Sequence, residues 1–473
     1  MITHKHVKTA LMYVLLLVAA GASAQMPATN TDTHSFSLQQ TVDYAKKNNT
    51  QVKNALLNLD IQKQQNRGIT AAAYPQLTGS IANNYYPNVQ VSVFPNFIAM
   101  GTYGVLTHEG VKNGNGVAIQ APADYGNIAA SFGTKYNASA GLSLSQILFD
   151  GQVFVGLQAR KASIDFQTKN LEVTEEVIKA NIEKVYYQLV VSKTQVKLID
   201  ANIERLEKLE HDAKELYKIG FAEKLDVDKV SVQLTNLQTQ KLSVLNSINI
   251  GYLGLKTLIG MPEKDALMLT DEVTESQIKD GIMQDAPYKY DDRKEYQYAM
   301  LGQKLNEYNI KRYKMSYLPG LYLNGNLSKQ AQRNQYDFFS KGDWFTSSFI
   351  GVSMSVSLFD GFAKDAKIKQ AKLELQQTEN NIDNLKRTID SDVEQATLNF
   401  KTAVATIDFQ KKNMGLAEAV YNQTKKKFEI GTGSNTEITA SQTDLVTAQT
   451  NYINALYSAI IAKVDYQKAI GKL

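Results

Sequence analysis

The sequence predicts a mixed α+β membrane protein in which very long coiled-coil helices are interrupted twice by β-hairpins. Three observations lead to this fold class. They are a duplicated order of short motifs, regions where apolar and small polar residues alternate, and apolar residues that recur every seven positions. The duplication indicates an internal two-fold sequence repeat, so both halves of the chain should follow one plan.

The repeat is defined by two markers that occur in the same order in both halves. The tetrapeptide Leu-Phe-Asp-Gly at 148–151 returns at 358–361. The dipeptide Ile-Gly at 219–220 returns at 430–431, so the two markers are about 70 residues apart in each half. The first half has roughly 34 additional residues before its tetrapeptide, and its Gly/Asn-rich run at 101–116 is expected to form a long loop.

The N-terminus has the pattern of a secretory signal peptide, residues 1–24. Two lysines form the basic start, residues 11–20 form the apolar core, and Ala22-Ser23-Ala24 is the small-x-small cleavage site. A membrane anchor is the alternative, but about ten apolar residues make only half of a span. No later stretch is apolar for long enough to form a transmembrane helix. We therefore expect a cleaved signal peptide and, because the chain has no cysteine, no N-terminal lipid anchor.

Alternation predicts two strands in each half. The segments are 77–85 and 138–145 in the first half, and 321–328 and 350–358 in the second. They could form a half-buried sheet in a soluble sandwich. They could also be transmembrane strands of about 9–11 residues, with apolar side chains toward lipid and small polar ones toward water. In that case the lipid-facing residues of the last strand are Ile350, Val352, Met354, Val356 and Leu358.

Apolar residues at seven-residue intervals predict long supercoiled helices. Beyond Gly151, the stretch to Lys214 has no proline and Gly156 is its one glycine. The second half repeats the pattern over 375–428. About 64 residues at 1.5 Å per residue make roughly 96 Å of helix, several times the usual length. The apolar stripe is narrow, so each helix should bury one seam and leave the rest of its surface wet.

The junctions between strands and helices carry residues suited to a change of direction. Asp is a good N-cap, and Gly lets the chain turn from a strand into a helix. Proline ends an incoming helix and begins an extended segment. On this basis we expect strand–helix junctions at Asp150, Gly151, Asp360, Gly361, Pro75 and Pro319.

Four strands per chain cannot close a membrane barrel, because the smallest barrels have about eight. An open edge in lipid would leave backbone groups without hydrogen bonds. If the strands span a membrane, several chains must therefore share one barrel. Two copies would give eight strands, filled by their own side chains, and three would give twelve, with a lumen.

The ordered and duplicated motifs resemble the TolC family of outer membrane efflux proteins, over about Ser37 to Leu473. The resemblance implies a homotrimer whose 12-stranded transmembrane β-barrel, four strands per chain, continues into a long periplasmic α-helical coiled-coil barrel. It implies a periplasmic adaptor (a membrane fusion protein), an inner-membrane transporter and outer-membrane lipid as partners. The function implied is that of an outer-membrane exit duct for tripartite efflux or type I secretion, which conducts its substrates passively.

The resemblance also implies two sites. A tip turn is the turn where two long helices of one half reverse direction. Acidic residues beyond the second tip turn would form a pore constriction, which in this chain is Glu437. Asp226 is its repeat-mate, and Asp444 is the next acid along the same helix. The family's second acid falls on Ala440, so a ring of carboxylates would be simpler in this chain. The turns where the helices reverse and the adaptor docks would be formed by Ile219, Gly220, Phe221, Ile430, Gly431 and Thr432.

The predicted organisation follows from these signals, and the family's equatorial insertion matches the segment that lies outside both repeats. After the signal peptide we expect a periplasmic helix at 25–74, a β-hairpin with a long extracellular loop at 75–150, a helix pair with its tip turn near 220 at 151–260, the equatorial insertion at 261–295, a helix at 296–318, a second β-hairpin at 319–360 and a helix pair with its tip turn near 431 at 361–473.

Composition and motifs exclude several functions. The formal net charge of +4, without a Lys/Arg cluster, argues against a nucleic-acid partner. The sequence His108-Glu109-Gly110 lacks the second histidine of a zinc helix, and no phosphate-binding or nucleophile motif occurs. We therefore expect no enzyme activity, no cofactor and no metal site, and energy for transport would have to come from a partner.

Two other interpretations remain open at this stage. One is a non-porous trimeric coiled-coil stalk or adhesin at the cell surface. The other is a soluble periplasmic coiled-coil scaffold. Against a stalk, the hairpins interrupt the helices twice instead of lying at one end of the sequence. Within the channel class, the residues do not decide between drugs, metals, peptides and proteins as substrate.

Overall fold

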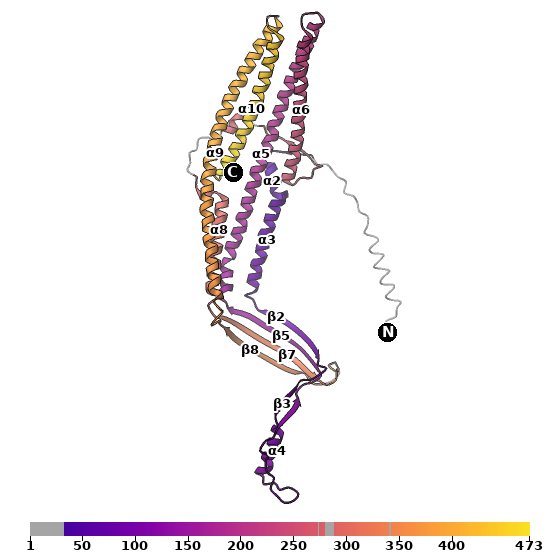
Figure 1. The fold of residues 1–473 in the computed structure, drawn as a ribbon, viewed down its shortest axis with the longest axis vertical. Helices are drawn as coiled ribbons and strands as arrows, with labels where there is room; N and C mark the ends of the chain where they lie inside the picture. The colour runs from indigo at the N-terminus through magenta and orange to yellow at the C-terminus, as the bar shows by residue number, and fades with distance from the viewer. Residues whose placement is uncertain (1–32, 273, 280–287, 340–341) are drawn as a thin grey trace, which may run out of the picture. The chain divides into compact units, whose positions relative to one another are not determined.

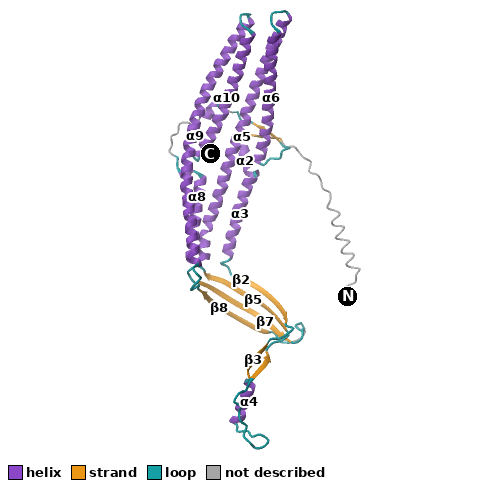
Figure 2. Ribbon diagram, in the orientation of Figure 1, coloured by secondary structure: helices purple, strands orange, loops and turns teal. Residues whose placement is uncertain are grey.

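The computed structural model describes residues 33–272, 274–279, 288–339 and 342–473. The predicted signal peptide at 1–24 lies outside these residues. Helices account for most of the described chain, and the strands are collected mainly in one sheet (Figure 2). In the parts of the chain that the structure describes, no helix is both long and apolar enough to cross a membrane.

The order of elements repeats a strand–helix plan along the chain (Figure 1). The strands are β1 (Thr33–Phe36), β2 (Gln76–Tyr85), β3 (Val91–Pro95), β4 (Asn127–Ser131), β5 (Tyr136–Phe149), β6 (Ala266–Leu269), β7 (Gly320–Arg333) and β8 (Phe345–Ser355). The helices are α2 (Leu38–Asn48), α3 (Thr50–Ala71), α4 (Phe97–His108), α5 (Gly151–Lys218), α6 (Lys224–Ile259), α7 (Glu275–Lys279), α8 (Lys294–Met315), α9 (Ala363–Glu429) and α10 (Asn435–Ala469), with a 3-10 turn at Tyr290–Asp292.

The chain forms two compact units. The first contains the described part of the N-terminal segment to Leu57, together with Lys169–Tyr298 and Asn384–Leu473. The second contains Asn58–Thr168 and Ala299–Asp383. The sheet and its connections therefore belong to the second unit, and both turns between long helices belong to the first.

The sheet of the second unit has four antiparallel strands in the order β2-β5-β7-β8. Two hairpins, β2–β5 and β7–β8, are joined side by side through β5 and β7. Asp150 begins α5 by accepting hydrogen bonds from the backbone N–H groups of Gln152 (2.8 Å) and Val153 (3.1 Å). Asp360 accepts from the N–H of Lys364 (3.0 Å), so both predicted aspartates lie at helix starts.

The core of the first unit contains aliphatic side chains of α5 and α6 around the buried ring of Tyr186. The Tyr186 hydroxyl donates to the carbonyl of Phe36 (3.1 Å) and accepts from the N–H of Asp271 (3.2 Å). Burial raises the pKa of Tyr186 to about 12, so the hydroxyl stays protonated. It links the β1 segment to the chain that follows β6, and β1 and β6 pair in parallel.

The expectation of one helix over 25–74 is wrong for the described residues. The segment contains β1, α2 and α3, and the helices are separated at Asn49, whose ψ of 131° is extended. The Asn49 carboxamide accepts from the N–H groups of Gln51 (2.7 Å) and Val52 (3.1 Å) and donates to the carbonyl of Leu258 (2.6 Å). It therefore caps α3 and fixes the break against α6.

Three other expectations need correction. The run at 101–116 is not all loop, because α4 extends to His108 after a cap in which Asn96 accepts from the N–H of Ala99 (2.9 Å). Val356 and Leu358 lie beyond β8, which ends where Ser355 pairs with Gly320, the first residue of β7. Gly151 makes no turn, since it lies within α5 and lacks a positive φ.

The prolines precede the strands as expected. Pro75 lies just before β2, and Pro319 lies just before β7. Gly361 has a φ of 64°, and Phe362 follows it with a φ of 66°. The chain therefore passes from β8 into α9 through two consecutive residues in the left-handed region, of which the sequence indicated the glycine.

Candidate functional site

The two faces of the four-stranded sheet differ in polarity. On one face, Asn324 donates to the Ser353 hydroxyl (2.8 Å) and Asn326 donates to the Ser143 hydroxyl (3.2 Å). These bonds cross from β7 to β8 and from β7 to β5. A row of short polar side chains therefore runs across three strands.

The opposite face is apolar and uncovered. Met354 pairs with Leu321, and Val352 pairs with Leu323, so their side chains lie together on this face. The exposed apolar residues of the face include Leu77, Ile81, Leu142, Leu327, Ile350, Val352 and Met354. Within the described residues, β2 and β8 each have one neighbour, so both edges of the sheet are open. The backbone N–H and C=O groups of an exposed edge strand are available to pair with a strand of another chain.

The two predicted tip turns have the same backbone geometry. After α5, Gly220 has a φ of 80°, and the N–H of Phe221 donates to the carbonyl of Leu216 (2.8 Å). After α9, Gly431 has a φ of 76°, and the N–H of Thr432 donates to the carbonyl of Lys427 (2.9 Å). Both are Schellman closures, in which glycine takes the left-handed position that ends a helix.

The helices that leave the turns also begin alike. Glu223 before α6 and Ser434 before α10 have the same φ and ψ, −88° and 154°. Asp226 accepts from the N–H of Glu223 (3.3 Å), and Glu437 accepts from the N–H of Ser434 (3.5 Å). Asp226 and Glu437, two of the three predicted constriction acids, are thus each the third residue of a capping box, where they stabilise the starts of their helices.

A cavity of about 750 Å³ lies between the two turns. The side chain of Asn435 donates to the carbonyl of Asp226 (3.0 Å) and joins the starts of α10 and α6 at this cavity. Around it, apolar side chains remain uncovered: Phe221 is 82% exposed and Ile430 is 73% exposed. The turns thus combine exposed apolar anchors with a cavity, which is typical of a docking surface.

Within a single copy of the chain, the three acidic residues predicted to form the pore constriction do not lie close together. Glu437 and Asp444 are exposed on α10, and Asp226 is half-buried at the start of α6. Asp226 lies at the cavity between the turns, through its contact with Asn435. A ring around a pore would require several copies of the chain.

A buried amide ladder between α5 and α10 was not predicted. Asn202 donates to the carboxamide oxygen of Gln449 (2.7 Å) and accepts from the side chain of Gln442 (3.0 Å). All three side chains are buried. Buried polar groups at a helical seam fix register at a cost in stability. The available signal was Asn202 itself, a polar residue between the seam residues Ile199 and Leu206.

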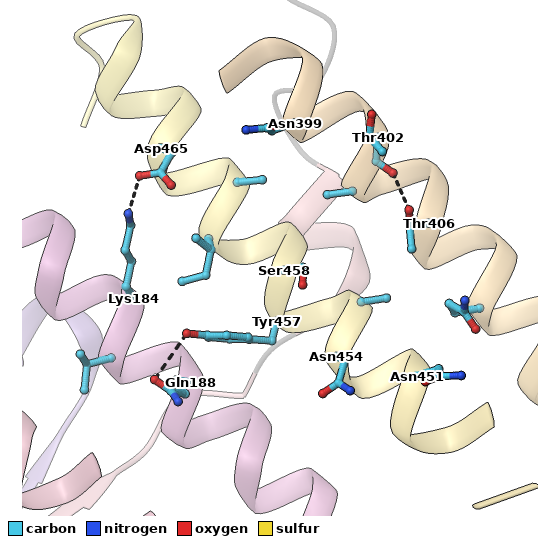
Figure 3. Close-up of a pocket in the computed structure, with 16 residues that line it drawn as sticks. Lys184, Gln188, Asn399, Thr402, Thr406, Asn451, Asn454, Tyr457, Ser458 and Asp465 are labelled. Atoms are coloured by element: carbon cyan, nitrogen blue, oxygen red, sulfur yellow. Dashed lines mark hydrogen bonds and ion pairs between the residues drawn. The ribbon is translucent and has the colours of Figure 1, made fainter. Parts of the chain in front are cut away.

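A second cavity, of about 990 Å³, is lined by α5, α9 and α10 (Figure 3). At one end, the Lys184 ammonium and an Asp465 carboxylate oxygen are 2.5 Å apart, and Tyr457 donates to Gln188 (3.4 Å). Its other labelled polar residues are neutral: Asn399, Thr402, Thr406, Asn451, Asn454 and Ser458. The remaining lining is small or aliphatic, with Val185, Ala403 and Ile461 among it, so the groove has a mixed surface in which neutral hydrogen-bonding groups alternate with apolar ones.

Hydrogen bonds, ion pairs and apolar contacts hold the short helix α7 against α9 and α10. The Glu275 carboxylate accepts from the Tyr452 hydroxyl (2.5 Å) and pairs with the Lys411 ammonium (3.0 Å). Lys279 pairs with Asp408 (2.5 Å) on α9. Ile278 is buried among apolar residues of α5, α9 and α10. The Tyr452 hydroxyl and the Lys411 ammonium hold the pKa of Glu275 below its ordinary value.

Comparisons with known proteins agree with this geometry. The model of the family described as "Outer membrane efflux protein" matches residues 293–472. Outer membrane protein TolC of Escherichia coli (strain K12) is 20% identical over 349 residues, or 71% of this chain and 69% of that protein. Outer membrane efflux protein BepC of Brucella suis biovar 1 (strain 1330) is 20% identical over 340 residues, 71% and 72% of the two chains.

Among solved structures, that of CusC, which concerns conformational changes accompanying folding and transmembrane channel formation, has a TM-score of 0.72 at 14% identity. The alignment covers 93% of both chains, which establishes the shared fold. Both relatives, TolC and BepC, are named as proteins of the outer membrane. None of these relatives carries the name of an enzyme.

Proposed function

Since the comparisons indicate an outer membrane efflux protein of the TolC-like kind, we propose that this chain forms the outer-membrane exit duct of a tripartite efflux or type I secretion system. The duct conducts passively, and an inner-membrane transporter supplies the energy through a periplasmic adaptor. The observation that carries this proposal is the sheet with one polar face, one uncovered apolar face and two open edges.

Three copies close the barrel in this proposal. The free edge of β8 in one chain pairs with the free edge of β2 in the next, and three sheets of four strands give twelve. Closure satisfies the backbone groups that an open edge would leave unpaired in lipid. The apolar face then meets lipid through Ile350, Val352 and Met354, and the Asn/Ser face lines the lumen.

The long helices form the periplasmic wall of the duct in this proposal. The groove of α5, α9 and α10 faces the water-filled lumen in this proposal, and α7 packs against α9 and α10 through other residues, such as Tyr452. A lining of neutral polar and apolar side chains, whose one charged pair is Lys184 with Asp465, conducts solutes of either sign, which suits an exit duct.

The tip turns are the docking surface for the adaptor. Phe221 and Ile430 supply exposed apolar anchors, and the cavity between the turns can receive a side chain of the partner. The repeated backbone geometry of the two turns gives each chain two similar docking positions. Glu437 of three copies forms the constriction around the three-fold axis, with Asp226 and Asp444 near it.

The test of this function is conductance of the purified protein in planar bilayers. A trimer with discrete channel openings is expected. A stable trimer without any channel would favour the coiled-coil stalk or adhesin. Recovery of the protein in the aqueous phase, without detergent, would favour a soluble scaffold and contradict the barrel.

A further inference from the structure

An apolar arm is inserted between β2 and β5, and neither the proposed barrel nor the docking turns use it. We define the arm as residues 86–135. At its root, Tyr85 pairs with Tyr136, and the N–H of Tyr86 donates to the carbonyl of Lys135 (2.7 Å). Pairing resumes with Val91 opposite Ser131, a register displaced by one residue. The β2–β5 hairpin therefore continues as the two-stranded ribbon β3–β4.

The other two strands of the sheet do not follow this ribbon. The pairing of β7 with β5 ends at Arg333, and the pairing of β7 with β8 ends at Gln330. A bend at 87–88 separates the sheet from β3, whose five residues at about 3.3 Å per residue make roughly 16 Å of ribbon beyond it. The helix α4 begins at the end of that ribbon.

An aromatic cluster marks the end of the sheet. The ring centroids of Tyr85 and Tyr136 are 4.9 Å apart, those of Tyr136 and Tyr336 are 5.7 Å apart, and those of Phe338 and Trp344 are 6.2 Å apart. Aromatic girdles of membrane barrels lie at the interface between lipid and water. The ribbon leaves the sheet at this girdle, so α4 lies beyond the reach of the acyl chains.

The composition of α4 does not suit a helix in water. Within this described helix no side chain is buried, and Ile98 is 57% and Val105 64% exposed. Residues 86–108 contain no Asp, Glu, Lys or Arg. An isolated helix of about 12 residues is marginal in water, and two internal glycines, Gly101 and Gly104, weaken it by about 1 kcal/mol each. A helix that is apolar on all sides requires a cover.

The proposed trimer supplies that cover. Twelve strands about 4.8 Å apart and tilted about 40° make a ring roughly 24 Å across, which sets equivalent strands of three copies about 20 Å apart. A ribbon of roughly 16 Å is longer than the distance of about 12 Å from this ring to its axis. The arm is also rooted at the edge strand β2, next to the seam with the neighbouring copy.

We propose that the α4 helices of three copies pack against one another over the external mouth of the channel and form an apolar cap. This inference rests on the proposed function, because the trimer brings the arms together. The cap buries Ile98, Met100 and Val105 of each copy and narrows the exit. The partner that this surface fits is thus a second copy of the same arm.

Cysteine cross-linking tests the cap directly, because the chain has no cysteine of its own. Single variants Ile98→Cys, Met100→Cys, Val105→Cys and Leu106→Cys are oxidised in whole cells and separated under non-reducing conditions. A disulfide needs Cα atoms within about 7 Å, so at least one variant should yield covalent dimers. Ser80→Cys on β2 is the matched control. It should yield no covalent dimers, since this residue of one chain is about 20 Å from the same residue of the next chain in the ring.

Failure of the cap and failure of the trimer give different results. A conducting trimer in which none of the four variants yields dimers overturns the cap alone. A chain that neither trimerises nor conducts overturns the proposed function and the cap with it. Quenching of a fluorophore on Val105→Cys by brominated lipid would identify lipid as the cover. Masking of that cysteine in cells, but not in purified trimers, would identify a foreign protein, and either result overturns the proposal.

The role of the cap in conductance has its own test. The double variant Ile98→Glu with Val105→Glu places six carboxylates in the cap of a trimer and should separate the helices. Single-channel conductance should rise at least twofold. Asn115→Glu, in the loop beyond α4, is the control with wild-type conductance. Unchanged conductance in the double variant would contradict a narrowing of the exit.

Discussion

The glycine of the repeated Leu-Phe-Asp-Gly motif is required for a different physical reason in each half of the chain. A Cβ atom on Gly151 would lie 2.7 Å from the carbonyl oxygen of Met315, at the end of α8, so the backbones of α5 and α8 approach too closely for any side chain. Its repeat-mate Gly361 has open space around it but a φ of 64°. One glycine permits a helix contact and the other permits a turn.

This difference leads to a prediction about stability. Gly151→Ala should lower the free energy of unfolding by about 1–3 kcal/mol, because α8 must shift to make room. Gly68→Ala is the control, since a Cβ at that position of α3 meets nothing, and alanine should stabilise the helix by up to about 1 kcal/mol. Thermal unfolding in detergent, followed by circular dichroism, measures both. Equal midpoints for the two variants would contradict the close contact.

At the scale of elements, the charge of Glu275 determines how firmly α7 is held. The pKa of Glu275 is lowered in the folded chain, so its contribution to stability is present above the unfolded pKa and is lost as the pH falls through the folded pKa. Asp408 raises the pKa of Lys279, whose contribution is lost only as the pH rises through that raised pKa. We therefore expect α7 to be held at neutral pH and released in acid.

Amide hydrogen exchange of residues 275–279 measures this attachment. Glu275→Gln at pH 7 should speed exchange by about threefold to tenfold, as expected for a lost charged hydrogen bond of about 1 kcal/mol. In the wild type, exchange corrected for its intrinsic rate should accelerate below about pH 4.5. Glu263→Gln, an exposed acid without an ion pair in the described structure, is the control. Wild-type exchange in Glu275→Gln would show that this carboxylate does not hold α7.

The tip turns allow a second prediction at this scale. Phe221→Ser combined with Ile430→Ser removes two side chains that are mostly exposed within the chain. Folding and trimer formation should be unchanged, whereas retention of the adaptor in a pull-down and export of substrate should fall at least tenfold. Leu242→Ser, an exposed position farther along α6, is the control. Normal export by the double variant would remove the turns from the docking surface.

The helices and strands that could be predicted are those in whose own sequence apolar residues recur at a regular interval. Alternation indicated β5, β7 and β8, and the seven-residue pattern indicated α5 and α9. The break at Asn49 has no such signal, because it depends on a contact with Leu258 on another helix. The pairing of β1 with β6 joins four-residue strands that are far apart in sequence and too short for alternation to register.

At the scale of the whole molecule, the backbone geometry of the two turns was easier to predict from the sequence than the surfaces that surround these turns. Ile-Gly at 219–220 and 430–431 indicated helix ends, because glycine alone tolerates the left-handed position well. The cavity between the turns could not be predicted, since the contact of Asn435 with Asp226 brings two repeats together. Roles that need several copies, such as the constriction, stay predictions of the assembly.

The lipid-facing side of the barrel gives a prediction at the scale of the assembly. Met354 and Ser353 are neighbours on opposite faces of β8, the first paired with Leu321 and the second bonded to Asn324. Met354→Arg should cost about 2–4 kcal/mol and abolish the stable trimer, as a charge does near a bilayer midplane. Ser353→Arg should assemble normally with altered conductance. The opposite outcome, measured by native electrophoresis and planar-bilayer recording, would mean that the faces are reversed.

The constriction gives the last prediction, because it needs all three copies. Three Glu437 carboxylates held near one axis repel one another, which favours cation binding in the ring. Glu437→Gln removes this charge but keeps the capping box with Ser434, since glutamine serves equally at the third helical position. Cation selectivity and block by multivalent cations from the periplasmic side should both weaken severalfold. Glu223→Gln, near the other turn, should change neither. Wild-type block in Glu437→Gln would place the constriction elsewhere along the duct.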